Sequence, residues 1–466
     1  MHLTIESLHH VHFIAIGGIS MSALASILMD RGIHVSGSDQ ALNELTAKLE
    51  QRGARVHLGH RSEQVDGCDV VVYSSAIKPD NPELVRAKEL GLPIWHRADL
   101  LAALVNSSRS VGVTGSHGKT TTSSMITEVF CKANLNPTAI LGGVLPSIGS
   151  NSISGDKESY LVAEIDESDS SLLKSRPFGA VITNIEADHL DHYGSFERII
   201  EVFTQFALQL PEHGFIVFGY DCPNTVELSK HPALANRRLI SYSTRGDAEY
   251  RATDIHATAF GCTSMVWHDD KILGKLELLV PGEYSVQNAL ACIAVALEIG
   301  LPWEVVAAAL REYTGPVRRF QLAGEAKGIT VYDDYAHHPS EIRALLHAAR
   351  ENNPKRLIAV FQPHLYSRTQ LLLQDFARCF SEADMLVLTD IYGAREAPVP
   401  GVDGAMLFDA VRAHDPESNV LYCADTSALP STVAAMLQPG DCVLMIGAGS
   451  INAFSPQLLS CLQDEE

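Results

Sequence analysis

The sequence predicts an α/β protein of three domains, and three observations lead to that fold class. The chain of 466 residues is too long for one ordinary hydrophobic core, and its length suggests about three domains. Short apolar segments that read as strands alternate with helical patterns, which is typical of open, largely parallel sheets. Glycine-rich or polar segments follow several of these strands, at the sheet edge where α/β proteins bind ligands.

The composition excludes several classes of partner. With 46% hydrophobic and 20% charged residues the chain is an ordinary globular one, and its net charge of -21 disfavours nucleic acid and anionic membranes, because an acidic surface repels both. Nine cysteines lack short paired spacings, so we expect neither disulfides nor a zinc site. With no export signal or long apolar segment, we expect a cytoplasmic protein. The oligomeric state is not indicated.

The first predicted domain, residues 1–108, begins with a Rossmann-like nucleotide-binding layout. A strand at 11–16 runs into Gly17-Gly18, a helix spans about 20–30, and a second strand ends at Asp39. An acidic residue about 20 positions beyond a glycine turn is typical of such sites. Serines break the strict G-x-G-x-x-G fingerprint, so an NAD enzyme is disfavoured. A third strand ends at Ser74, a residue type suited to ligand contact, although a purely structural domain fits the pattern equally well.

The central predicted domain, residues 109–322, is arranged around the segment 115–121, GSHGKTT. It reads as a glycine turn between a strand and a helix, where backbone N–H groups converge on a phosphate. Lys119 adds a positive charge and Thr120 a hydroxyl suited to phosphate-bound Mg²⁺. A lysine in the first helical turn opposes the helix dipole, so it is better explained by a bound anion than as an incidental turn residue. Val113 replaces one usual P-loop glycine, which makes this a shortened variant that we expect to bind a nucleoside triphosphate.

Acidic residues follow the next strand, 160–163. Four carboxylates, at positions 164, 166, 167 and 169, repel one another, and a divalent cation would relieve that repulsion. A solvated acidic loop is the alternative. The strand 180–183 leads into NIEADHLDHY, which again places aspartate and histidine at a strand end. We expect these two strands to be adjacent, and two adjacent strands that end in this way favour a functional site over a single structural histidine.

Two further features complete the central domain. Short β-like segments between 249 and 280 indicate that part of its sheet is antiparallel. The helix 286–298 carries Asn288, whose amide can pair with a purine edge, although an exposed asparagine at a helix end fits equally well. Arg318 and Arg319 follow a Gly-Pro hinge, where they either clamp a migrating phosphoryl group or lie solvated at the surface.

The third predicted domain, residues 323–466, is another open α/β sheet. We expect strands at 329–332, 357–361, 385–388 and 442–446, and helices at 339–350 and about 371–380. Polar clusters follow the first two of these strands. In the second cluster His364 and Arg368 offer cationic partners for a small carboxylate, with helix capping as the alternative.

Five segments, in this order over nearly the whole chain, resemble the Mur ligases of peptidoglycan synthesis: GSHGKTT, EIDESDSSLL, NIEADHLDHYG, YDDYAHHPSEI and FQPHLYSRT. They look most like the ligase that joins L-alanine to UDP-N-acetylmuramate. The nearest alternative is a recycling ligase that attaches a murein tripeptide to the same sugar nucleotide, but it lacks the DHLD and FQPHxYxRT forms. Folylpolyglutamate synthase shares the central ATPase but not this N-terminal domain. A nucleotide-regulated binding protein would not need these paired carboxylates and histidines.

The resemblance implies ATP as a substrate, Mg²⁺ or Mn²⁺, and an acyl phosphate formed from the lactyl carboxylate and then attacked by the alanine amine. The catalytic residues would be Lys119, His189 and Arg319. ATP would contact Gly115, Ser116, His117, Gly118, Lys119, Thr120, Thr121, Asn288 and Asp334. The metal would be held by Thr120, Glu164 and His189. UDP-sugar contacts would be Gly17, Gly18, Asp39 and Ser74, and alanine contacts Tyr335, His337, His364 and Arg368.

The sequence departs from the family pattern at four positions. Leu365 stands where relatives often have arginine, so recognition of the alanine carboxylate would depend more on Arg368. Tyr284 and Ser285 stand where His and Asn are frequent, which affects the expected adenine contacts. Ser20 replaces a usual glycine near the expected diphosphate site.

Overall fold

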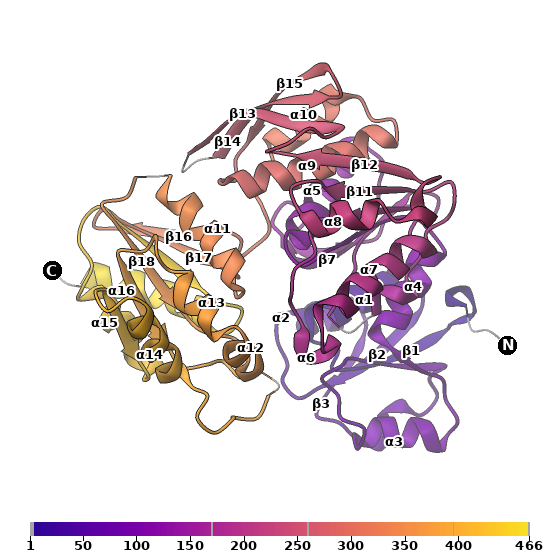
Figure 1. The fold of residues 1–466 in the computed structure, drawn as a ribbon. Coiled ribbons are helices and arrows are strands. Elements are labelled where there is room, and N and C mark those ends of the chain that lie inside the picture. Colours follow the sequence, from indigo (N-terminus) through magenta and orange to yellow (C-terminus); the bar gives the residue numbers. More distant parts are fainter. Residues whose placement is uncertain (1–3, 169–170, 259–260, 352, 395, 465–466) are drawn as a thin grey trace. The chain divides into compact units, whose positions relative to one another are not determined.

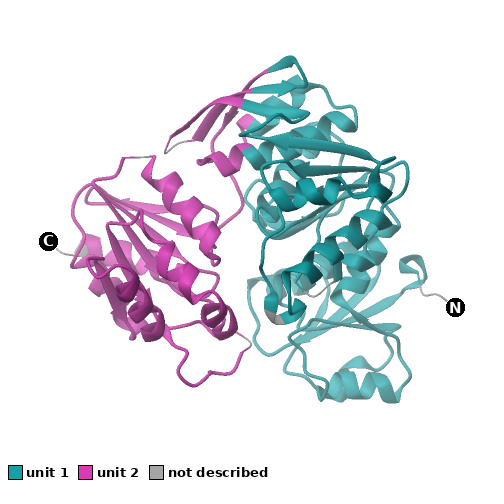
Figure 2. Ribbon diagram, in the orientation of Figure 1, with its two compact units in different colours: residues 1–252, 266–273, 287–310 teal, residues 253–265, 274–286, 311–466 magenta. Residues whose placement is uncertain are grey.

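A computed structural model describes residues 4–168, 171–258, 261–351, 353–394 and 396–464 (Figure 1). The described residues form two compact units (Figure 2). Unit 1 consists of residues 1–252, 266–273 and 287–310, and unit 2 of residues 253–265, 274–286 and 311–466. Three β-sheets flanked by helices confirm the predicted α/β class. Among the described residues, no helix has the length and apolar character needed to cross a bilayer.

The N-terminal sheet is fully parallel, in the order β3-β2-β1-β4-β5. Its strands are β1 (His10–Ile14), β2 (His34–Asp39), β3 (Arg55–Leu58), β4 (Val70–Tyr73) and β5 (Ile94–His96). Its helices are η1 (Ile5–Ser7), α1 (Ile19–Asp30), α2 (Glu44–Gln51), η2 (Ser62–Val65), α3 (Pro82–Glu89) and α4 (Arg97–Asn106). Asparagine side chains cap α2 and α3, since Asn43 and Asn81 each accept hydrogen bonds from first-turn N–H groups.

The central sheet has ten strands in the order β15-β14-β13-β12-β11-β10-β6-β9-β7-β8. These are β6 (Arg109–Thr114), β7 (Thr138–Leu145), β8 (Ser150–Ile153), β9 (Tyr160–Glu164), β10 (Gly179–Ile182), β11 (Phe215–Gly219), β12 (Arg238–Ser243), β13 (Tyr250–Thr258), β14 (Gly261–His268) and β15 (Lys271–Leu278). The helices are α5 (Lys119–Lys132), η3 (Ser171–Lys174), α6 (Leu190–Tyr193), α7 (Phe196–Gln209), α8 (Pro223–Ser229), η4 (Pro232–Leu234), α9 (Glu283–Glu298) and α10 (Trp303–Arg311).

The order of the central strands sets the place of the expected site. β9 and β10 both pair in parallel with β6, one on each side, so their carboxyl ends meet at the same edge as the glycine turn. We expected β9 and β10 to be neighbours, and this was wrong, because β6 lies between them. The division between the units runs across β13, β14 and β15. The two-residue connection between β14 and β15 is typical of the antiparallel hairpin predicted there.

Apolar periodicity explains how helices cover this sheet. α7 buries residues spaced by three or four, Ile199, Val202, Phe203, Phe206 and Ala207, on one face. Ser195 caps its first turn by accepting a hydrogen bond from the N–H of Arg198. The buried residues of α7 join the main hydrophobic core of unit 1.

The C-terminal sheet has the order β16-β17-β21-β18-β19-β20 and is parallel except for the β16–β17 pair. Its strands are β16 (Gln321–Ala326), β17 (Ile329–Asp334), β18 (Arg356–Phe361), β19 (Met385–Thr389), β20 (Val420–Cys423) and β21 (Asp441–Ile446). Its helices are α11 (Pro339–Arg350), α12 (Tyr366–Leu371), α13 (Leu373–Arg378), α14 (Gly404–His414), η5 (Thr426–Ala428), α15 (Leu429–Ala434), η6 (Ile451–Ala453) and α16 (Phe454–Asp464). The helix expected at about 371–380 is the shorter α13, and α12, which was not predicted, precedes it. Leu372, with ψ 18°, separates the two helices.

Candidate active site

The glycine turn after β6 has the geometry predicted from the sequence. β6 ends at Thr114 and α5 begins at Lys119, with Gly115 at φ 125° and Gly118 at φ 83°. A side chain at either glycine would also collide with a neighbour: a Cβ at position 115 would overlap the Thr183 hydroxyl, and one at 118 would lie 2.5 Å from Oδ1 of Asn288. Only glycine suits both positions, because each combines a left-handed backbone with no room for a Cβ.

Asn184 holds the glycine turn at Ser116 and His117, a role that was not predicted from the sequence. Its carbonyl oxygen accepts from the N–H of Ser116 at 3.0 Å, and its Oδ1 accepts from the N–H of His117 at 2.8 Å. The hydroxyl of Thr183 donates to the carbonyl of His117 at 2.6 Å. The N–H groups of Ser116 and His117 are therefore engaged within the protein, and an anion would meet those of the first turn of α5.

The ammonium group of Lys119 is held back against its own loop. Nζ donates to the carbonyls of Gly115 and Ser116 at 2.6 and 3.0 Å and to Oε1 of Glu167 at 2.8 Å. Burial alone would lower the pKa of Lys119, but the carboxylates of Glu167 and Glu164 outweigh it and raise the pKa above its ordinary value. Lys119 is thus a permanent positive charge at the start of α5.

The carboxylates after β9 are neutralised in part by the protein itself. Asp166 pairs with Nη2 of Arg97 at 2.6 Å, and although burial opposes it, Arg97 and Lys119 hold the pKa of Asp166 well below its usual range. Glu164 accepts from the N–H of Gly142 at 3.1 Å. Asp169 lies outside the described residues. Arg97 therefore already relieves, at Asp166, part of the repulsion that a cation was predicted to relieve.

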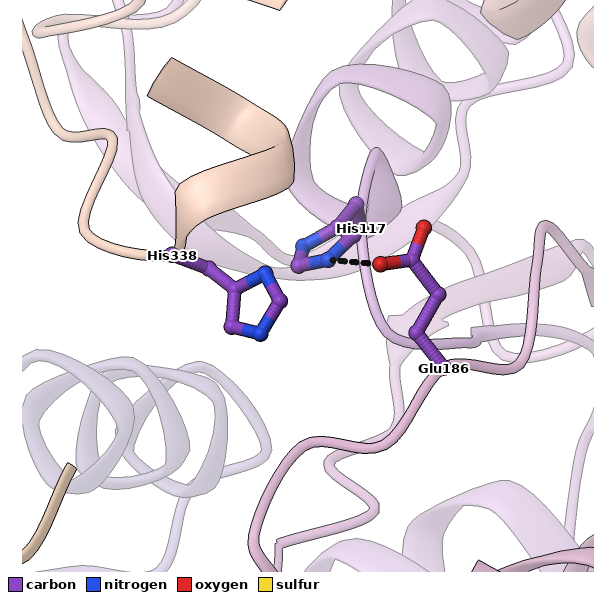
Figure 3. A group of neighbouring side chains, drawn as sticks. All are labelled: His117, Glu186 and His338. Carbon is purple, nitrogen blue, oxygen red and sulfur yellow. Dashed lines mark ion pairs between the residues drawn. The ribbon is translucent and has the colours of Figure 1, made fainter. Parts of the chain in front are cut away.

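Histidines follow β6 and β10 near these carboxylates. Nε2 of His189 lies 3.6 Å from Oε1 of Glu167 and from Oδ2 of Asp188. His189 has φ 56°, an uncommon left-handed conformation for a residue with a side chain. His117 pairs with Glu186 at 3.4 Å, and Figure 3 shows the imidazole facing that carboxylate. Carboxylate, hydroxyl and imidazole groups of this kind suit a divalent cation, so Thr120, Glu164 and His189 remain the predicted ligands.

Asn288, predicted to contact a purine, lies against the glycine turn at Gly118. It is 8% exposed, and its Oδ1 accepts from the hydroxyl of Thr122 on α5 at 3.2 Å. Tyr284 packs instead on the hydrophobic core of unit 2, and Ser285 donates to the carbonyl of Pro281. The two residues that depart from the family pattern are thus used in packing and in a local turn.

The N-terminal glycine turn is fixed by two polar side chains. The N–H of Gly17 donates to Oδ2 of Asp39 at 2.8 Å, and Nδ2 of Asn43 donates to the carbonyl of Gly17 at 3.0 Å. Oδ1 of Asp39 accepts from the N–H of Ala41. Asp39, which we expected to face the UDP group, therefore uses one oxygen on the glycine turn and the other on the segment that follows β2. Gly18 caps α1, and the carbonyl of Ser74 closes a turn after β4.

A buried polar network within the N-terminal sheet was not predicted. Glu83 is fully buried and lies 3.1 Å from Nε2 of His12 and 3.1 Å from Nδ1 of His60. The hydroxyl of Ser38 donates to Oε2 of Glu83 at 2.6 Å, and Ser36 bonds to Nδ1 of His12 at 2.8 Å. Its members come from β1, β2, α3 and a loop, and no local sequence pattern links them.

In unit 2 the predicted alanine-site residues do come together. The ring of His337 lies 5.6 Å from that of Tyr335 and 6.1 Å from that of His364. Nη1 of Arg368 lies 3.4 Å from Nδ1 of His364, and Arg368 is 9% exposed. His364 also stacks on Tyr392 at an interplanar angle of 17°. The cluster places cationic and aromatic groups at the carboxyl ends of β17 and β18.

The hinge arginines and Asp334 have structural partners in unit 2. Asp334 accepts from the N–H of Phe320 at 2.6 Å and from that of Ala336 at 2.7 Å, so the residue predicted to contact ribose uses both oxygens on the backbone. Arg318 donates to the carbonyl of Gly447. Arg319 lies over the ring of Tyr335, 5.3 Å from its centroid.

Comparison with known families covers almost the whole chain. Residues 10–109 match the "Mur ligase family, catalytic domain", residues 113–296 the "Mur ligase middle domain" and residues 318–449 the "Mur ligase, glutamate ligase domain". The glycine turn with Lys119 and the acidic strand ends lie within the middle-domain match. The chain belongs to the Mur ligase family.

The similar individual proteins are ligases of the same kind. The UDP-N-acetylmuramate--L-alanine ligase of Synechococcus sp. (strain JA-3-3Ab) is 47% identical, over 95% of this chain and 84% of its own. The enzyme of the same name from Thermosynechococcus vestitus is 45% identical over 96% and 95%. The crystal structure of UDP-N-acetylmuramate-alanine ligase from Thermotoga maritima matches with a TM-score of 0.82 and 29% identity, covering 98% of this chain and 100% of that one. A murein peptide ligase from Psychrobacter arcticus, 24% identical with a TM-score of 0.72, shares the fold.

Proposed function

We propose that this chain joins L-alanine to the lactyl carboxylate of UDP-N-acetylmuramate in a reaction driven by ATP, as a step of peptidoglycan precursor synthesis. Support comes from relatives named UDP-N-acetylmuramate--L-alanine ligase, which are 41–47% identical over at least 95% of the chain. The observation that carries the proposal is the glycine turn between β6 and α5, in which Lys119 stands beside buried carboxylates.

The proposed reaction has two bond-forming steps. A lactyl carboxylate oxygen attacks the γ-phosphorus of ATP, ADP leaves, and an acyl phosphate forms. The alanine amine then attacks the acyl carbon, loses a proton, and inorganic phosphate leaves with the oxygen that came from the carboxylate. A carboxylate is a poor electrophile until it is phosphorylated, which is why the reaction needs ATP. Lys119 and Arg319 would offset the negative charge on the transferred phosphoryl group.

We also propose a division of labour between three domains. Residues 1–108 would bind the UDP-sugar, residues 109–322 ATP, and residues 323–466 the amino acid. Asp39 would act on the sugar nucleotide through the Gly17 turn that it supports, and Asp334 would hold the hinge backbone next to Arg319. The cluster of Tyr335, His337, His364 and Arg368 would bind alanine, with Arg368 on its carboxylate.

A divalent ion, Mg²⁺ or Mn²⁺, would serve as the resident cofactor at Thr120, Glu164 and His189. Such an ion supplies Lewis-acid stabilisation of phosphate oxygens. The chain's own part is to position those ligands at the ends of β9 and β10 and at the start of α5. Since ATP is an intracellular substrate, we propose a cytoplasmic location.

The two other candidate functions have less support. Attachment of a murein tripeptide is represented by structures at 24% and 27% identity with TM-scores of 0.72 and 0.61, below the 29% and 0.82 of the alanine ligase from Thermotoga maritima. A binding protein without ligase activity would not need both the glycine turn with Lys119 and a separate cluster of cationic side chains at His364 and Arg368.

Release of inorganic phosphate tests the proposal. We expect ATP-dependent phosphate release only when UDP-N-acetylmuramate and L-alanine are both present. The same assay with glycine, L-serine and the tripeptide measures the preference among acceptors. Phosphate release with UDP-N-acetylmuramate and the tripeptide, but not with UDP-N-acetylmuramate and L-alanine, would favour the recycling reaction. Binding of ATP and UDP-N-acetylmuramate without any phosphate release would favour the binding protein.

A further inference from the structure

Glu167 occupies the last available hydrogen bond of Lys119. The three acceptors around Nζ are the carbonyls of Gly115 and Ser116 and Oε1 of Glu167, at 2.6, 3.0 and 2.8 Å. An ammonium group has three N–H donors, so all of them are used. A phosphate that binds Lys119 must replace one of these acceptors. Glu167 is the anion among them and competes directly with the phosphate.

The other oxygen of Glu167 makes no hydrogen bond to any described residue. The side chain is 3% exposed, and in the part of the chain that the structure describes Oε2 has no hydrogen-bond partner. The peptide carbonyl of Glu167 accepts from the hydroxyl of Tyr193, which fixes the backbone here. An unsatisfied buried polar atom is unfavourable, and more so when it is charged. Such an oxygen is suited to a cation that the chain does not itself supply.

A histidine approaches the same carboxylate. Nε2 of His189 is 3.6 Å from Oε1 of Glu167, and the N–H of His189 is held by Oδ1 of Asp188 at 2.8 Å. The left-handed backbone of His189 is strained, and the surrounding structure must hold it in place. Imidazole nitrogen and carboxylate oxygen are ligands that Mg²⁺ or Mn²⁺ can accept together.

We infer that Glu167 exchanges Lys119 for a divalent cation when the nucleotide binds, an inference that rests on the proposed function. Once a phosphate takes the ammonium, Glu167 is a buried carboxylate without a counter-charge, which is strongly unfavourable. A cation bound through Oε2 restores the charge balance. Glu167 thereby couples binding of the metal to binding of the phosphate, and it opposes nucleotide that arrives without metal.

The first test uses Glu167→Gln in the full-length chain. We expect Mn²⁺ to bind the complex with the ATP analogue AMP-PNP at least tenfold more weakly, as measured from the free Mn²⁺ signal by electron paramagnetic resonance. In EDTA, AMP-PNP should bind the variant severalfold more tightly, because no carboxylate competes for Lys119. Glu201→Gln, which removes an exposed carboxylate paired with Arg198, is the matched control and should change neither value. Unchanged Mn²⁺ affinity in Glu167→Gln would overturn the inference.

A second test needs no nucleotide and therefore separates this inference from the proposed function. Lys119→Ala should raise the Mn²⁺ affinity of the free protein severalfold, because Glu167 loses its resting partner. The gain should disappear in the double variant Lys119→Ala, Glu167→Gln; a gain that persists there would show that the ion binds elsewhere.

Circular dichroism checks that each variant is folded. If the glutamine variant does not fold, Glu167→Asp, which keeps the charge, should show an intermediate Mn²⁺ affinity, and full affinity would contradict the exchange. Wild-type protein that binds no AMP-PNP would overturn the proposed function itself.

Discussion

Unlike an ordinary surface lysine, Lys119 has its ammonium group fixed by three hydrogen bonds. All three of its donors are used, and neighbouring carboxylates keep its pKa above the ordinary value despite burial. The ammonium group therefore stays charged and positioned before any substrate arrives. Preorganised charge of this kind stabilises a transition state without reorganisation at the moment of reaction.

Replacement of Lys119 by alanine should lower kcat by roughly 100-fold or more, because it removes the charge proposed to offset that of the phosphoryl group. Phosphate release measured with saturating substrates gives kcat, and far-UV circular dichroism should show an intact fold. Lys132→Ala, at the far end of the same helix, removes the same charge and should leave kcat close to that of the wild type. Near-normal turnover of Lys119→Ala would refute the assigned role.

Asp333 gives a prediction for the pH dependence of stability. Burial raises its pKa to about 6 from 3.8, even though Arg318 lies 3.3 Å away and opposes the shift. A carboxylate with a raised pKa binds its proton more tightly in the folded state, so stability falls as pH rises from about 4 to about 6. Relative to Asp333→Asn, the wild type should lose about 2 kcal/mol of unfolding free energy over this range.

Urea unfolding at pH 4.5 and pH 7 measures that difference. Only the change with pH is interpreted, because the asparagine variant also alters the contact with Arg318. Asp375→Asn, an exposed position on α13, should show the same pH dependence as the wild type. A wild type and Asp333→Asn variant with parallel pH dependence would contradict the raised pKa.

At the scale of single elements, the strand–glycine–helix unit is the part of the site that the sequence predicted best. The signal is local: the glycines at positions 115 and 118 mark positive φ, and the following residues begin α5. The hydrogen bonds of Asn184 to the glycine turn and the buried network around Glu83 could not be predicted, since the residues involved meet only through tertiary folding. For the same reason the backbone hydrogen bonds of Asp39 and Asp334 were not foreseen, although both residues were singled out.

Gly118→Ala tests the fit of this element. Gly118 has φ 83°, and an added Cβ would lie 2.5 Å from Oδ1 of Asn288. We expect AMP-PNP to bind at least tenfold more weakly by calorimetry, because the first turn of α5 must shift. Gly67→Ala is a close control: its φ is 84°, but nothing lies within 4 Å of the added Cβ. It should carry only the backbone strain of about 1 kcal/mol and bind the analogue normally. Equal affinities of the two variants would count against the close fit at position 118.

At the scale of the whole molecule, three sheets present different chemistry at the carboxyl ends of their strands. The N-terminal sheet carries a glycine turn, the central sheet a phosphate loop with carboxylates, and the C-terminal sheet a cationic and aromatic cluster. The alternation of strands and helices predicted this fold class. It did not predict the break at Leu372 or the place of β6 between β9 and β10, which depend on packing.

The proposed binding of ATP and L-alanine by different domains predicts kinetic defects that can be separated. Arg368→Ala should raise the KM for L-alanine at least tenfold while changing that for ATP little, because Arg368 is proposed to bind the alanine carboxylate through a charge-assisted hydrogen bond. Initial rates with one substrate varied at a time give both constants. Arg378→Ala, on the exposed side of α13, removes an arginine away from the cluster and should leave both unchanged. Equal increases in the two KM values of Arg368→Ala would argue against a site specific for the amino acid.

The central claim is that the terminal phosphoryl group of ATP passes to the carboxylate of the sugar nucleotide before the amide bond forms. Transfer of ¹⁸O from a labelled lactyl carboxylate tests it most directly, with the released phosphate analysed by mass spectrometry. The account predicts one carboxylate oxygen in each phosphate formed per turnover. Amide formation accompanied by phosphate without the label would contradict it.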